Sequence, residues 1–138
     1  WGRMPLAISA RCYHARSHGL HKDGCQYVCD IDPDGLDVMT VDKQPFLTVN
    51  GTQTLSSSCL SLLPELEDLS ASGVNHFRLS PQTVDMVKVA TIFRDVLDGA
   101  DHSTEGEVKL AAMNSGFVTS NGFVHGDEGW RLIKEVQN

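Results

Sequence analysis

Three cysteines near the start of the chain have the residue type and the spacing of metal ligands. Cys12, Cys25 and Cys29 lie between Arg11 and Gly35, and three residues separate the second cysteine from the third. Three histidines lie among them: His14, His18 and His21. Zinc binds mixed cysteine and histidine ligands, whereas iron–sulfur clusters are held by thiolates. Glycines and a proline in the same stretch disfavour regular structure, so a bound metal would order this loop.

Other uses of these thiols are open to the same residues. A disulfide suits secreted chains, but residues 1–10 have neither the long apolar core nor the cleavage site of a signal peptide. Inert buried thiols do not fit the polar, glycine-rich surroundings. A catalytic cysteine would need a base, which His14 or His18 would have to supply to Cys12. Metal binding accounts for more of the cysteines, although their spacing does not choose between iron and zinc.

Cys59, the fourth cysteine, lies apart from this loop and has two interpretations. It precedes a leucine-rich helical pattern, and a lone cysteine beside leucines is most often part of the core. Alternatively it completes the ligand set, so the candidate metal ligands are Cys12, Cys25, Cys29 and Cys59. No residue is singled out as catalytic.

The elements that would position the thiols begin with a short apolar strand. Met4–Ser9 has the pattern of a buried barrel strand, and it ends just before Cys12. Active sites of (β/α) barrels lie at the C-terminal ends of their strands. After the cysteine loop, Leu36–Val41 and Pro45–Val49 are separated by three polar residues and predict a hairpin, followed by a turn at Asn50-Gly51. We interpret this hairpin as an insertion that supports the loop.

The second half of the chain alternates helical and extended patterns. Apolar residues recur with a helical period in two segments, which Gly73 and Gly99 would end. The predicted order is helix Ser61–Ser72, strand Val74–Leu79, helix Thr83–Leu97, short helix Glu107–Asn114 and packed tail Gly116–Gly129. Strand followed by helix predicts an α/β fold with parallel strands.

The composition is that of one acidic globular domain. The 138 residues are 41% hydrophobic, enough for a core, so we expect a single domain over residues 1–138. The net charge of −7 argues against nucleic acid as a partner, because phosphate binding needs a concentrated basic surface. No run approaches the ~20 apolar residues of a membrane-spanning helix. Thiols without an export signal indicate a cytoplasmic protein.

Several segments have a family resemblance that covers nearly the whole chain. They read GRMPLAISARCYHAR, KDGCQYVC, NGTQT, LPELEDLSASGVNHFRLSPQ and NGFVHGDEGW. These segments resemble the branch of the collagenase-like peptidase family U32 that acts in ubiquinone biosynthesis. The resemblance implies a TIM-like (β/α) barrel of which this chain would be the C-terminal part, since such barrels typically take ~250 residues.

The resemblance also implies a cofactor, a partner and a substrate. The cofactor is a 4Fe–4S cluster bound by Cys12, Cys25 and Cys29. The wider family places a fourth cluster cysteine near Cys59, but the ubiquinone branch takes it from upstream. The partner is a second, related protein in a heterodimer, and the pair hydroxylates polyprenylated aromatic precursors without O₂.

Three other functions stay open beside this one. The family name suggests a peptidase, which clustered thiols fit less well than a metal. Other members of the family act on RNA, against which the acidic charge of this chain counts. A structural zinc module would use the same cysteines.

Overall fold

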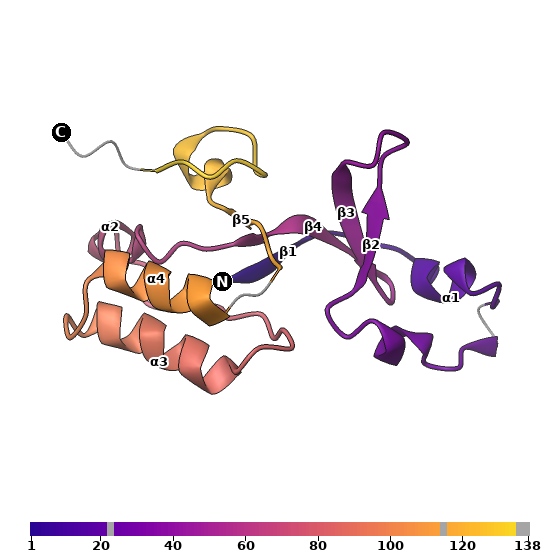
Figure 1. Cartoon of the computed structure of the whole chain (residues 1–138), viewed down its shortest axis with the longest axis horizontal. Coiled ribbons are helices and arrows are strands. Elements are labelled where there is room, and N and C mark those ends of the chain that lie inside the picture. Colours follow the sequence, from indigo (N-terminus) through magenta and orange to yellow (C-terminus); the bar gives the residue numbers. More distant parts are fainter. Residues whose placement is uncertain (22–23, 114–115, 135–138) are drawn as a thin grey trace. The chain divides into compact units, whose positions relative to one another are not determined.

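The computed structural model describes residues 1–21, 24–113 and 116–134, which form two compact units (Figure 1). One unit is Arg3–Cys59, and the other combines Trp1–Gly2 with Leu60–Asn138. The fold is mixed α/β, as the sequence predicts. Whether the two units act as one domain stays a prediction.

The unit Arg3–Cys59 is built on an antiparallel sheet. Its strands are β1 (Gly2–Ile8), β2 (Leu36–Met39), β3 (Pro45–Asn50) and β4 (Gln53–Leu60), in the order β1-β4-β3-β2. Both β2 and β4 run antiparallel to β3. The predicted hairpin is therefore confirmed, and Lys43 and Gly51 adopt positive φ in its turn and the next. Short α1 (Tyr13–Ser17) and the 3₁₀ turn η2 (Val28–Ile31) carry the cysteine loop.

The prediction of parallel strands is wrong for this sheet. Asn50 pairs with Gln53, so only two residues join β3 to β4, and a connection this short can join only antiparallel neighbours. Strand β4 itself was not predicted, because serine and threonine replace the expected apolar residues along much of it. The predicted TIM-like barrel is not confirmed.

Strand β1 departs from its prediction in burial. Its first two residues are buried, but Leu6 is 50% and Ile8 80% exposed. The apolar run therefore predicted a strand correctly but its burial wrongly. The reason is that β1 is the last strand in the order of the described sheet.

Arg3 ties the strands of this unit together from a buried position. Its guanidinium donates to the Thr48 hydroxyl, to the Ser56 and Ser57 carbonyls at 3.0 and 2.8 Å, and to Asp37 Oδ1 at 3.1 Å. These acceptors lie on β3, β4 and β2. Satisfying several donors at once is what allows a charged group to lie within a sheet core.

The other unit is mostly helical. It contains α2 (Leu66–Ala71), α3 (Met86–Leu97) and α4 (Ser103–Met113), then β5 (Thr119–Ser120) and η3 (Gly122–His125). Helices α3 and α4 lie side by side (Figure 1). Gly106 of α4 allows this close packing, since a Cβ there would lie 3.2 and 3.3 Å from Val96 Cγ2 and Ile92 Cγ2 on α3. The buried core comprises Leu63, Leu66, Val89, Ile92, Phe93 and Leu110.

The helix ends match the sequence better than the helix starts. Gly73 and Gly99 adopt positive φ and donate to carbonyls in the last turns of α2 and α3, as the prediction of C-caps requires. The predicted starts are wrong. Helix α2 begins after Pro64, because proline disfavours helical geometry in the residue before it. Helix α3 begins after Asp85, which is its N-cap. No described helix is both long and apolar enough to cross a bilayer.

The segment Val74–Leu79, predicted as a strand, forms no strand in the described sheet. It is held by Trp1, whose amino group donates to the Arg78 carbonyl at 2.9 Å and whose carbonyl accepts from Ser80 N–H at 2.8 Å. Two bonds that bracket one residue, Leu79, are the pattern of parallel neighbours. The prediction of a strand over Val74–Leu79 is therefore wrong, and the pairing with Trp1 involves only one residue of this segment.

Candidate functional site

Cys12 lies at the N-terminus of helix α1 and is half-buried. Its side chain caps the helix, with Sγ accepting a hydrogen bond from Ala15 N–H at 3.3 Å. A short polar acceptor at this position satisfies one of the free amides of a helix start. Hydrogen bonds to sulfur are also among the contacts that tune cluster-bound thiolates.

Cys25 and Cys29 lie further along the same loop, and neither is in a disulfide. Cys25 is exposed, while Cys29 is half-buried within η2. Tyr27, at φ 55°, precedes η2, and Asp32 follows it. The Asp32 N–H donates to the Cys29 carbonyl at 3.3 Å. Cys25 thus lies in an irregular exposed segment and Cys29 in a half-buried 3₁₀ turn, both outside the core.

Cys59 has a different environment. It lies in strand β4 and is 1% exposed, so its predicted position at a helix start is wrong. Burial within a sheet fits the alternative in which this cysteine belongs to the core.

One group of potential metal ligands forms among the residues that the structure describes. His14, His18 and Asp32 each offer a ligand atom within 4.8 Å of the others. The cysteine sulfurs do not form such a group, and their convergence on one centre stays a prediction. Asp32 was not singled out from the sequence, where it is one of three acids near Pro33.

The geometry of this group does not suit a metal as it stands. His14 is fully buried, and its Nε2 lies 3.0 Å from Asp32 Oδ2. The rings of His14 and His18 stack with centroids 5.8 Å apart and planes inclined by 9°. A metal ion binds in the plane of an imidazole ring, so two stacked rings do not direct their nitrogens at one ion. The arrangement is that of a hydrogen-bonded pair covered by a second ring.

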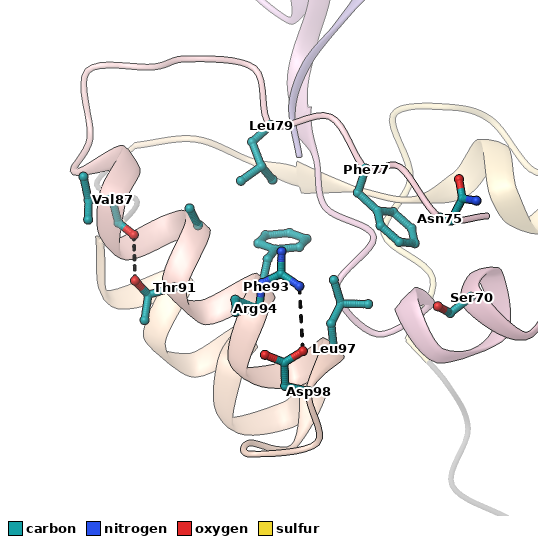
Figure 2. A pocket seen from close by; sticks show the side chains of 11 residues that line it. Ser70, Asn75, Phe77, Leu79, Val87, Thr91, Phe93, Arg94, Leu97 and Asp98 are labelled. Atoms are coloured by element: carbon teal, nitrogen blue, oxygen red, sulfur yellow. Dashed lines mark hydrogen bonds and ion pairs between the residues drawn. The ribbon is translucent and has the colours of Figure 1, made fainter.

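A pocket of about 690 Å³ lies in the helical unit, between residues 75–79 and helix α3 (Figure 2). Phe77, Phe93 and Leu97 face it, and Arg94 pairs with Asp98 at its edge at 3.7 Å. Apolar walls with a few charged groups are typical of sites for small organic ligands. None of the four cysteines lines this pocket.

A buried polar network anchors the C-terminal part of the chain. Glu65 Oε1 accepts from Asn121 Nδ2 at 2.7 Å and lies 2.8 Å from His125 Nε2. The Asn121 amide also donates to the Ile133 carbonyl and accepts from Ile133 N–H, at 2.9 and 2.7 Å. These contacts anchor the segment, but Phe123 and Trp130 are 55% and 65% exposed, so the predicted packed tail is packed only around this network.

Comparison with known protein families finds one family model that matches both units. The sequence model described as peptidase family U32 matches residues 1–134. The matched range includes the cysteine loop, Cys59 and the Glu65 network. No solved structure matches the chain.

Proposed function

The chain belongs to peptidase family U32, and from this we propose that it is a UbiV-like iron–sulfur protein of oxygen-independent ubiquinone biosynthesis. In this proposal it acts in the cytoplasm with a UbiU-like partner, and together they hydroxylate polyprenylated aromatic precursors. The observation that carries the proposal is the loop of three thiols, each outside the core and none in a disulfide.

The thiols Cys12, Cys25 and Cys29 fit a 4Fe–4S cluster in chemistry and exposure. Cys12 caps α1, Cys25 lies in an irregular segment and Cys29 lies in η2, and Cys12 already accepts one amide hydrogen bond of the kind that stabilises cluster thiolates. When bound, such a cluster supplies one-electron transfer or substrate activation. Cys59 is left out of the proposed ligands because its sulfur lies in the core.

The pocket beside α3 supports the substrate part of the proposal. Its volume of about 690 Å³ and its apolar walls of Phe77, Phe93 and Leu97 suit an aromatic ring or part of an isoprenoid chain. Arg94 and Asp98 form an exposed ion pair at the edge, and a phenolic or carboxylate group would have to share the charge of Arg94 with Asp98.

The peptidase function implied by the family name finds less support in the geometry. Cys12 Sγ accepts from a backbone amide, and His14 directs one ring nitrogen at Asp32. The other ring nitrogen of His14, Nδ1, is buried without a hydrogen-bond partner. His14 and Cys12 therefore do not form the hydrogen-bonded dyad that activates a nucleophilic cysteine.

The proposal predicts iron and sulfide in the anaerobically purified protein. We expect equal amounts of both, with broad visible absorption. Cys25→Ala should lose most of the iron, because it removes an exposed ligand, whereas Cys59→Ser should retain it. Zinc without sulfide in the wild-type protein would instead establish a structural zinc site on the same cysteines, which is the second candidate.

A further inference from the structure

The cysteine loop contains two turns that are far apart in the sequence but contact each other. Cys12 caps α1, and Cys29 lies in η2. The two elements are in contact, and the hydrogen bond between His14 and Asp32 joins them across 18 residues. His14 follows Cys12 by two positions, and Asp32 follows Cys29 by three.

The buried position of His14 makes this hydrogen bond necessary. Its side chain is 0% exposed, and among the residues that the structure describes Nδ1 has no hydrogen-bond partner, so Asp32 provides the hydrogen bond of the ring. In the neutral form with the proton on Nε2, the ring donates to the carboxylate and Nδ1 keeps only a lone pair. Without Asp32, a buried N–H would be left unsatisfied, which costs more than an average hydrogen bond is worth.

The backbone of Asp32 is also held, by a hydrogen bond to η2. Its N–H donates to the Cys29 carbonyl at 3.3 Å, and its side chain is 30% exposed. A displacement of Asp32 would therefore move the backbone of Cys29. The same holds for His14, because it lies in the first turn of α1, two residues after Cys12, whose sulfur caps the helix.

We propose that His14 and Asp32 are positioning residues that hold Cys12 and Cys29 at the separation needed to bind a metal centre. This inference rests on the proposed function for the identity of that centre. Ordering the loop before binding lowers the entropic cost of closing a long loop around the metal. Groups that orient metal ligands without touching the metal typically change affinity by about ten- to a hundredfold when they are removed.

The test compares His14→Ala and Asp32→Ala with a matched control, His18→Ala. His18 stacks on His14 but is exposed and forms no part of the bond to Asp32. Iron and sulfide content and the rate of iron loss to a chelator are measured on the anaerobically purified proteins. We expect both test variants to lose iron about ten- to a hundredfold faster, and the control to match the wild type. Loss of metal in all three variants would instead identify His14, His18 and Asp32 as ligands themselves.

Two further measurements separate positioning from misfolding and from failure of the proposed function. His14→Gln, whose amide can donate to Asp32, should restore part of the iron retention that His14→Ala loses. Hydrogen exchange of the α1 amides in metal-free protein should be faster in His14→Ala and Asp32→Ala than in His18→Ala. Equal exchange in all variants would overturn the inference even if the wild-type protein contained no iron. A wild-type protein without iron but with the expected exchange would overturn only the proposed function.

Discussion

At the scale of single residues, side chains distant in sequence define the architecture more than the chemistry-bearing residues do. Arg3 connects three other strands, and Asn121 joins Glu65 to Ile133. Neither residue stands out in the sequence, because an arginine or asparagine carries no pattern that reveals its partners. Asp32 escaped prediction for the same reason, although the thiols beside it were found from their spacing.

Replacing Asn121 tests how strongly the C-terminal segment is anchored. Asn121→Ala removes the side-chain hydrogen bonds to Glu65 and Ile133 and the 3.4 Å contact with His125, and it leaves Glu65 with one partner fewer. We expect a loss of about 2–4 kcal/mol in the free energy of unfolding, because buried groups lose their partners. Denaturant unfolding measures it. The exposed Asn75→Ala is the control and should change stability by less than about 0.5 kcal/mol.

Gly35 and Gly19 form a second matched pair, which separates backbone strain from steric overlap. Both adopt positive φ, at +94° and +71°, but a Cβ at Gly35 would lie 2.5 Å from Thr48 Cγ2, and one at Gly19 would meet nothing within 4 Å. Gly19→Ala should cost about 1 kcal/mol from backbone strain alone. Gly35→Ala should cost about 3 kcal/mol, since it adds overlap in a packed region. Equal losses would show that the sheet yields around Thr48.

At the scale of elements, features that depend on neighbouring residues were predicted correctly, whereas the direction in which distant strands pair was not. Gly73 and Gly99 marked the helix ends because a C-cap depends on one residue's conformation. The β2–β3 hairpin was found because its turn is local. Strand direction was not found, since the pattern of Val, Leu and Ile is the same in parallel and antiparallel strands. Strand β4 was not predicted because its many serine and threonine residues lack the apolar pattern that indicates a strand.

Asp85 allows the start of α3 to be tested by pH. Its carboxylate accepts from Lys88 N–H at 3.1 Å, and this bond lowers the pKa of Asp85 below 3.8. A carboxyl group whose pKa is lower in the folded than in the unfolded protein stabilises the fold at pH values above its unfolded-state pKa. This stabilisation is lost as the pH falls through its folded-state pKa.

We therefore expect Asp85→Ala to lower the thermal midpoint by a few degrees at neutral pH. The difference from the wild type should shrink progressively below pH 3.8. Asp85→Asn, which keeps an acceptor for the same amide, should lose less at neutral pH, and its difference from the wild type should also shrink below pH 3.8, because only the wild type titrates at this position. A pH-independent difference for Asp85→Ala would argue against the carboxylate as the cap.

At the scale of the whole molecule, the composition predicted an acidic globular chain, and the resemblance predicted its family. The matching range of residues 1–134 assigns both compact units to one family, which neither the charge nor the hydrophobic content could do. The α/β class was predictable from alternating patterns. The barrel was an expectation of the resemblance, and the antiparallel sheet of the described residues does not confirm it.

The exposed strand β1 has a practical consequence for work with this chain. Leu6 and Ile8 present apolar side chains on β1, which is the last strand in the order formed by the described residues, and an edge strand can pair with a strand of another molecule. Purified samples should therefore lose monodispersity as concentration rises, before any heating. A random screen for better expression would be expected to select polar residues at positions 6 and 8 sooner than changes in the helices. Crystallisation trials would gain most from the same two substitutions.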